Sequence, residues 1–101
     1  MDLLVPCTVL AVNGHSPSAM IFPLQISAAR VLIGMSQQEL ASAASIGLGT
    51  VKRIEAAREE LAGTAQTIGR IQHALEAAGI VFIEQDGRNG PGVRLRKPIR
   101  L

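Results

Sequence analysis

Apolar residues recur at helical spacing through the middle of this chain, between polar stretches that contain glycine. The first such stretch covers residues 24–33 and ends before Gly34, a residue typical of the position just after a helix. We expect a helix here that packs through one apolar face. That face comprises Leu24, Ala28, Val31 and Leu32.

The same periodicity predicts three further helices, over residues 37–44, 48–57 and 65–78. Thr64 is a suitable N-cap for the last of them, and Gly79 follows its final apolar position. Together with the first stretch, these segments predict a domain of four helices.

After residue 79 the pattern changes to that of β-strands. Residues 80–83 are β-branched or aromatic throughout, and residues 93–96 alternate apolar and basic side chains. The intervening residues 86–92 are rich in Gly and Asn, which favours a turn. The sequence therefore predicts a mainly α fold: four helices over residues 24–79, then a C-terminal β-hairpin and basic tail over residues 80–101.

An isolated hairpin is only marginally stable, so it must pack on the fourth helix or pair with another chain. We expect the helical core to be complete by Ala78, and residues 80–83 are apolar at four consecutive positions. These two points predict a homodimer. The contact would be made by residues 80–96 or by an N-terminal arm, residues 1–23, in which residues 3–12 are apolar and strand-like. Without such a contact we expect the arm to be poorly ordered.

The residues from 36 to 55 have the pattern of two short helices joined by a tight turn. Ser36 and Glu39 have the spacing of a capping box, which marks the start of the first of these helices. Ile46 falls in the turn, and Val51 and Ile54 resume helical spacing after it. Small residues in the first helix would let the second cross it closely. This layout is typical of a helix-turn-helix, which presents its second helix to the DNA major groove.

This stretch resembles the phage-repressor-like (Xre/Cro/C1-type) helix-turn-helix family, and the resemblance covers roughly residues 24–78. The family has Gly in the turn where this chain has Ser45, so we expect Ser45 to adopt a left-handed conformation. It usually has polar residues where this chain has Gly47, Leu48 and Gly49. The residues that carry the resemblance are Gln37, Leu40-Ala41, Ser45-Ile46, Val51 and Ile54-Glu55.

The resemblance implies a four-helix repressor-like domain that binds double-stranded DNA in a sequence-specific way, as a homodimeric transcriptional regulator. It also implies an ion pair between Arg30 and Glu55, which would tie the first helix to the third. Gln37 and Thr50 are the candidates for phosphate contacts. The candidate positions on the recognition helix are Leu48, Gly49, Thr50, Lys52 and Arg53.

Within that recognition helix, Lys52 or Arg53 would bond the O6 and N7 atoms of guanine, and Leu48 would contact a thymine methyl group. An alternative remains open. The same fold serves as a protein-interaction module, antitoxin-like or anti-repressor, and the neutral charge of the motif and the Gly47-Leu48-Gly49 start of the recognition helix are compatible with that alternative. No catalytic constellation occurs in the sequence, so we do not expect an enzyme.

Charge is unevenly distributed along the chain, whose formal net charge is +2. Residues 24–63 carry four basic and four acidic side chains, whereas residues 64–101 carry six basic and three acidic ones. DNA binding requires neutralisation of phosphates. We therefore expect the basic C-terminal segment to supply part of that charge.

The composition narrows the remaining possibilities. With 101 residues the chain is one domain by length, and with two Phe, no Trp and no Tyr its core must be aliphatic. Cys7 is the sole cysteine, and His15 and His73 have no ligand partners at metal-binding spacing. We expect no metal, cofactor or small-molecule ligand, no membrane span, and a cytoplasmic location.

Overall fold

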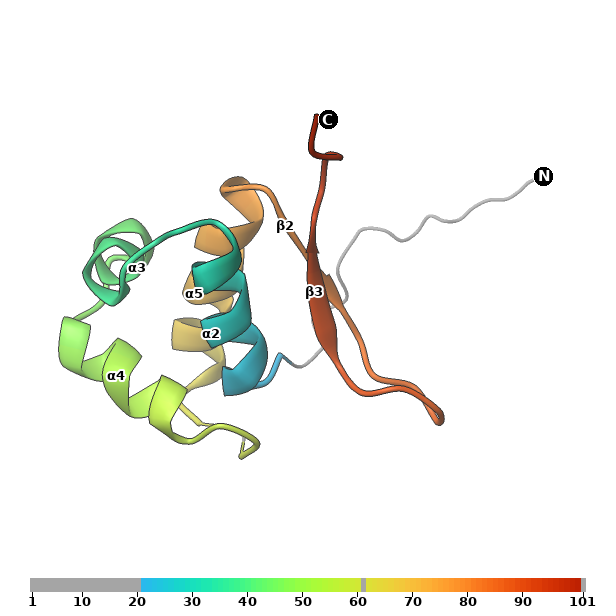
Figure 1. The fold of residues 1–101 in the computed structure, drawn as a ribbon. Coiled ribbons are helices and arrows are strands. Elements are labelled where there is room, and N and C mark those ends of the chain that lie inside the picture. The colour runs from blue at the N-terminus through green and yellow to red at the C-terminus, as the bar shows by residue number, and fades with distance from the viewer. Residues whose placement is uncertain (1–20, 61, 101) are drawn as a thin grey trace.

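The computed structural model describes residues 21–60 and 62–100, which form a mainly α structure with four helices and a two-stranded antiparallel hairpin (Figure 1). The predictions about residues 1–20, including the arm, Cys7 and His15, lie outside this described part. The elements are α2 (Pro23–Leu32), α3 (Gln37–Ala44), α4 (Leu48–Ala56), α5 (Ala65–Ala77), β2 (Ile80–Ile83) and β3 (Gly92–Leu95).

Helix α2 packs through the face opposite to the one predicted. Proline is favoured in the first turn, where its missing N–H is not needed, so Pro23 starts the helix. The predicted inward residues are exposed instead, with Val31 at 67% and Leu32 at 46% exposure. The physical reason lies in Arg30, which shares the side of Ile26 and must face α4 to meet Glu55. The residues of α2 that are buried are Pro23, Gln25, Ile26 and Ala29.

Helices α3 and α5 begin at the predicted caps. The hydroxyl of Ser36 accepts from the backbone N–H of Glu39 at 3.0 Å, and the Glu39 carboxylate accepts from the N–H of Ser36 at 2.8 Å. The Thr64 hydroxyl accepts from the N–H of Thr67 at 3.1 Å. Each bond satisfies an N–H group that the first helical turn leaves without a partner.

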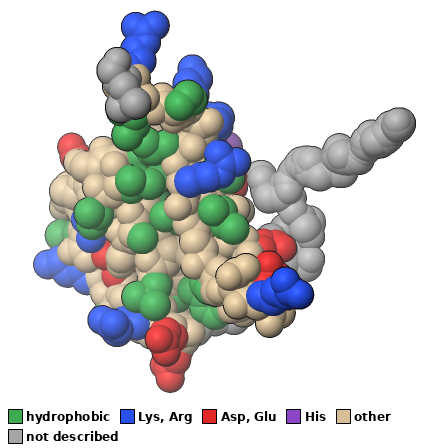
Figure 2. Space-filling model, turned by 45° about the vertical axis from the view of Figure 1, so that its right-hand side comes forward, with side chains coloured by type: hydrophobic (Ala, Val, Ile, Leu, Met, Phe, Trp, Pro, Cys, Tyr) green, Lys and Arg blue, Asp and Glu red, His purple; other side chains and the backbone are tan. Residues whose placement is uncertain are grey.

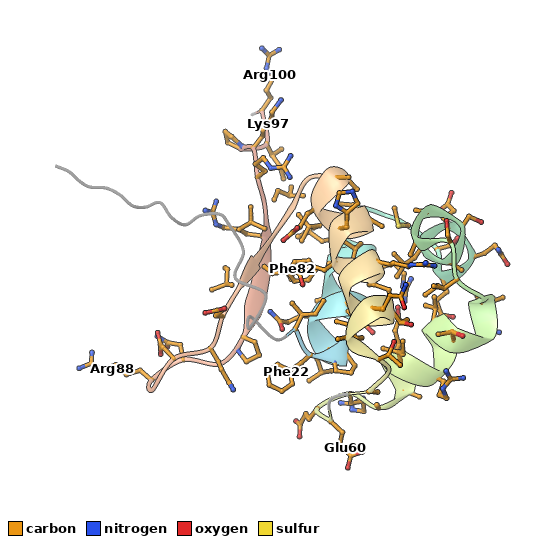
Figure 3. The ribbon with its side chains drawn as sticks, turned by 180° about the vertical axis from the view of Figure 1, so that it is seen from behind. Phe22, Glu60, Phe82, Arg88, Lys97 and Arg100 are labelled. Carbon is orange, nitrogen blue, oxygen red and sulfur yellow. The ribbon has the colours of Figure 1, made fainter. Side chains whose placement is uncertain are left out.

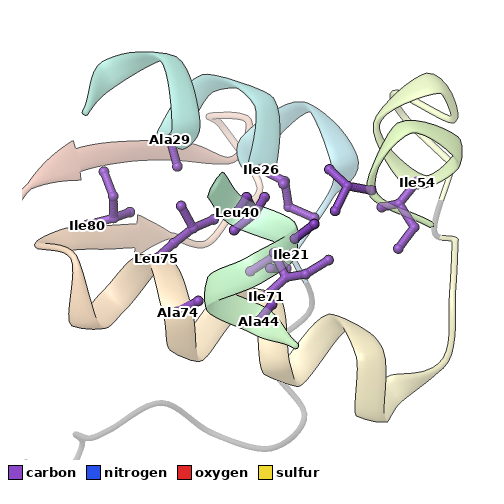
Figure 4. Close-up of a cluster of buried hydrophobic side chains, with 12 residues drawn as sticks. Ile21, Ile26, Ala29, Leu40, Ala44, Ile54, Ile71, Ala74, Leu75 and Ile80 are labelled. Atoms are coloured by element: carbon purple, nitrogen blue, oxygen red, sulfur yellow. The ribbon is translucent and has the colours of Figure 1, made fainter. Parts of the chain in front are cut away.

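The core is aliphatic, as the composition predicts, and lies where the four helices and the hairpin meet (Figure 4). Its largest members include Leu40 on α3, Ile54 on α4, and Ile71 and Leu75 on α5, all fully buried. Small side chains on α3 let α5 approach closely. The buried hydrophobic residues are Ile21, Ile26, Ala29, Leu40, Ala41, Ala44, Val51, Ile54, Ile71, Ala74, Leu75 and Ile80.

The hairpin completes this core, so the expectation that the helices close it by residue 78 is wrong. Ile80 is 1% exposed, and Phe82, Val93 and Leu95 pack against the buried cluster. The strand pairing places Ile80 opposite Leu95 and Phe82 opposite Val93, so these four side chains share the inner face. A chain that ended at residue 79 would lose part of its core.

The hairpin lies beside α2 and α5, on the side of the molecule away from α3 and α4 (Figure 1). Lys97 and Arg100 extend from the end of β3, again away from α4 (Figure 3). The basic tail and α4 of one chain therefore do not share a face. Within one chain, the tail therefore does not place its charges beside α4; whether it contacts phosphates elsewhere stays a prediction.

Candidate nucleic-acid interface

A three-residue turn joins α3 to α4. Ser45 has φ 59° and ψ 45°, the left-handed conformation predicted for it. The N–H of Ile46 donates to the carbonyl of Ala41 at 3.0 Å, which satisfies an end group of α3. Ile46 packs partly against the core. Gly47 is the N-cap of α4 and has no side chain that could accept from the first N–H groups of the helix. The turn thus fixes the direction in which α4 leaves α3.

The carboxylate of Glu55 joins three helices. Arg30 on α2 donates to it twice, from Nε to Oε2 at 2.9 Å and from Nη2 to Oε1 at 3.0 Å. The amide of Gln37 on α3 donates to Oε1 at 3.0 Å. Arg30 also donates from Nη1 to the carbonyl of Met35 at 3.0 Å. The ion pair that the family resemblance implied is therefore present, and it holds the last turn of α4 against α2 and α3.

Burial and partners act in opposite directions on Glu55. Its side chain is 7% exposed, and desolvation alone would raise its pKa. Hydrogen bonds from Arg30 and Gln37, together with the charge of Arg30, outweigh that effect and hold the pKa of Glu55 below its usual value. The hydrogen bond to Glu55 is the largest cause of the raised pKa of Arg30, and the negative charge of Glu55 adds to it. Both groups are therefore charged at neutral pH.

The outer side of α4 is exposed, and no described residue holds it by a hydrogen bond or an ion pair. Val51 and Ile54 are fully buried, whereas Lys52 and Arg53 are exposed, as their spacing predicts. Gly49 is also exposed. We call the surface formed by Gly49, Lys52 and Arg53 the outer face of α4. It is a rigidly supported helix surface with two positive charges.

Two other candidate residues of α4 are only partly accessible. Leu48 is half-buried and packs against the core, so only part of its side chain could reach a thymine methyl group. Thr50 is half-buried as well. Gln37, at the start of α3, commits an amide donor to Glu55, which leaves less of its side chain for a phosphate. The structure thus brings all six candidates to one region but exposes Gly49, Lys52 and Arg53 most.

The glycines at the start of α4 are not required by the fold. Neither Gly47 nor Gly49 has a positive φ. A Cβ added at Gly49 would meet nothing within 4 Å, and one at Gly47 would meet only the Thr50 hydroxyl, at 3.9 Å. Glycine inside a helix, as at position 49, costs about 1 kcal/mol relative to alanine, whereas the N-cap position of Gly47 suits glycine. At position 49 the backbone of α4 is therefore not covered by a side chain.

Sequence reasoning missed two features of the described residues. Gln25 is 3% exposed and bonds both strands of the hairpin, a contact between positions 58 and 67 residues apart that no local pattern signals. A shallow open groove lies between α3 and α5, where Arg70 donates to the carbonyl of Ser45 at 3.3 Å and His73 forms part of the wall. Arg70 adds a positive charge beside the turn that leads into α4.

Over 21–60 and 62–100, no group of three or more His, Cys, Asp or Glu side chains is placed to hold a metal ion. Within those ranges, no helix combines the length and apolar character that crossing a membrane requires. Neither a scan against protein-family models nor a search of curated proteins finds a match to this chain.

Proposed function

We propose that α3 and α4 form a helix-turn-helix of the phage-repressor-like type, and that the protein is a transcriptional regulator that binds double-stranded DNA. The observation that carries the proposal is the outer face of α4. The helix is fixed at its last turn by Glu55 and along its inner side by Val51 and Ile54, yet its outer side is basic and exposed. A rigid, exposed helix of this kind suits the major groove.

The roles of individual residues follow from their exposure. Lys52 and Arg53 are long, exposed donors that can reach the O6 and N7 atoms of guanine. Gly47 and Gly49 let the backbone at the start of α4 approach a phosphate, where N–H groups and the helix dipole favour an anion. Leu48 adds a limited apolar contact to a thymine methyl group.

Useful affinity requires two copies. One helix-turn-helix covers a small area, and proteins of this type bind two half-sites about one helical turn apart as dimers. We therefore propose a homodimer on a two-fold symmetric DNA site.

The experiment is selection of bound sequences from a pool of random duplex DNA, followed by a salt titration on the selected duplex. We expect an enriched half-site repeated with two-fold symmetry. Affinity should fall steeply between about 50 and 200 mM salt, because bound phosphates release counterions. No enrichment, or an affinity that does not change with salt, would contradict the proposal.

A second candidate function has its own observation. The outward side of α2 exposes Leu24 at 39%, Leu32 at 46% and Val31 at 67%. Exposed apolar residues grouped on one helix are typical of protein-interaction surfaces. An antitoxin-like or anti-repressor module would use such a surface to bind a protein. Figure 2 turns the side of the molecule that carries the hairpin toward the viewer, and hydrophobic side chains are exposed at several places on it. The selection experiment separates the two candidates, because a protein-interaction module would enrich no DNA sequence.

A further inference from the structure

Among residues 21–60 and 62–100, nothing pairs with the outer edge of either strand of the two-stranded sheet. The N–H of Arg96 donates to the carbonyl of Gly79 at 2.8 Å, so residues 79 and 96 form a hydrogen-bonded pair. Antiparallel ladders alternate such pairs with pairs whose backbone groups point outward. By this alternation the backbone N–H and C=O groups of Ile80 and Phe82 point away from β3, at the outer edge of β2. Those of residues 93 and 95 point away from β2, at the outer edge of β3. Within the described residues, none of these groups bonds another element.

The two edges differ in charge on the sheet's outer face, the face turned away from the helices. Because the inner face holds Ile80 and Phe82, the outer face of β2 holds Val81 and Ile83, and that of β3 holds Arg94. Ile83 is 42% exposed, and Val81 is half-buried. The outer face is therefore apolar along β2 and basic along β3.

This difference decides which edge can pair with itself. A two-fold axis through β3 that matches its outward backbone groups would set Arg94 directly opposite the partner's Arg94, and facing like charges destabilise a sheet. The same arrangement at β2 matches Ile80 with the partner's Phe82. It also sets Val81 opposite the partner's Val81, a β-branched pair that is favourable across strands.

We propose that β2 pairs antiparallel with β2 of a second copy about a two-fold axis at Val81, which forms a continuous four-stranded sheet in the order β3-β2-β2-β3. Its outer face has Val81 and Ile83 of both copies at the centre and an Arg94 on each flank. Such a pairing closes as a two-fold dimer and leaves the β2 edges covered. The pairing agrees with the dimer contact predicted for residues 80–96, and it specifies which strand makes the contact and in which register.

The inference deepens the proposed function, since it supplies the second copy that a two-fold DNA site needs, and its biological meaning rests on that function. The test contains no DNA. If the dimer test fails, the proposal of DNA binding is not affected. If the protein fails to bind DNA, the inference about the dimer still stands.

The test uses full-length protein and charge pairs at position 81. We expect wild type to sediment as a dimer at tens of micromolar, and Val81→Lys and Val81→Asp each to sediment as folded monomers, because like charges would meet at the axis. A 1:1 mixture of these two variants should restore a dimer, because Lys would then face Asp. The control, Arg94→Asp, changes a charge on the neighbouring strand and should remain dimeric. Circular dichroism confirms that each variant is folded.

Three results would overturn the inference. The first is a wild-type protein that stays monomeric, and the second is a mixture of the two charged variants that does not associate. The third concerns the amides of Ile80 and Phe82, whose hydrogen exchange should slow as protein concentration rises through the dimerisation range. Slow exchange at every concentration would mean that a strand of the same chain, such as residues 3–12, covers the edge instead.

Discussion

The side-chain amide of Gln25 donates to the carbonyl of Ile83 at 3.1 Å, so the first helix holds the hairpin directly. The same nitrogen donates to the carbonyl of Gly92 at 3.0 Å, and the Gln25 oxygen accepts from the N–H of Phe22 at 2.7 Å. One buried amide thus ties together the start of α2 and both strands. In Figure 3, Phe22 and Phe82 flank this region of contact between helix and hairpin.

Replacement of this amide should loosen the hairpin. Gln25→Met keeps the length of the side chain but leaves the two carbonyls without their donor, so we expect a loss of about 1–3 kcal/mol in the free energy of unfolding. Gln38→Met, at an exposed position of α3, is the matched control and should change stability by less than about 0.5 kcal/mol. Urea denaturation measures both. Equal effects would show that the Gln25 bonds do not support the fold.

The ion pair between Arg30 and Glu55 should couple strongly. Their side chains are 17% and 7% exposed, so removal of one leaves the other poorly solvated. We expect Arg30→Met or Glu55→Gln to cost about 3 kcal/mol or more in unfolding free energy. The double mutant should cost much less than the sum, with a coupling above the roughly 1 kcal/mol of surface pairs. Additive single effects would rule out an energetic link between these two side chains.

Stability should fall in acid because of Glu55. Its pKa is lowered in the folded state, so this contribution is fully present above the ordinary carboxyl pKa of about 4.3 and is lost as pH falls through the lower folded value. Asp86, whose pKa is lowered by the N–H groups of Arg88 and Asn89, acts in the same direction. Glu55→Gln should therefore flatten the decline in unfolding free energy below about pH 4.3. A variant with an unchanged acid slope would contradict this assignment.

Local chemistry made much of this fold predictable from sequence. The capping pair Ser36 and Glu39 marks where α3 begins, and a turn that needs a left-handed residue at Ser45 leaves few alternatives. Both features depend on residues close in the chain. The positions of the two strands and the exposure of Lys52 and Arg53 also follow from patterns among residues close in the chain.

The errors arose where distant contacts decide between local options. Helix α2 has two apolar stripes, one through Leu24 and Val31 and one through Ile26 and Ala29, and periodicity alone does not choose between them. The position of Arg30 beside Ile26 does choose, because Arg30 must face Glu55. The docking of the hairpin on α2 had no such local signal, because it depends on contacts between residues far apart in the chain, such as Gln25 with Ile83 and the packing of Ile80 on the core.

The glycine at position 49 offers a test in which stability and binding should change in opposite directions. Gly49→Ala removes a poor helix former from a position with free space, so we expect a gain of about 0.5–1 kcal/mol in unfolding free energy. The added methyl group should weaken binding to the selected duplex, because in the proposed complex the backbone at position 49 approaches a phosphate. Gly69→Ala on α5, which also has free space, should stabilise the fold equally without loss of binding. If the two variants bind the duplex equally well, Gly49 is not part of the DNA interface.

The most direct test of the central claim compares two pairs of positive charges on opposite sides of the molecule. Lys52→Ala with Arg53→Ala removes the charges of α4, and Lys97→Ala with Arg100→Ala removes the same number from the tail. Affinity for the selected duplex should be measured at matched salt. The first double variant should lose tenfold or more in affinity, as expected for contacts worth about 1–3 kcal/mol each, and should lose discrimination between selected and random DNA. The second should keep that discrimination. If the first variant binds the selected duplex as wild type does, or if only the tail variant loses specificity, α4 is not the helix that reads DNA.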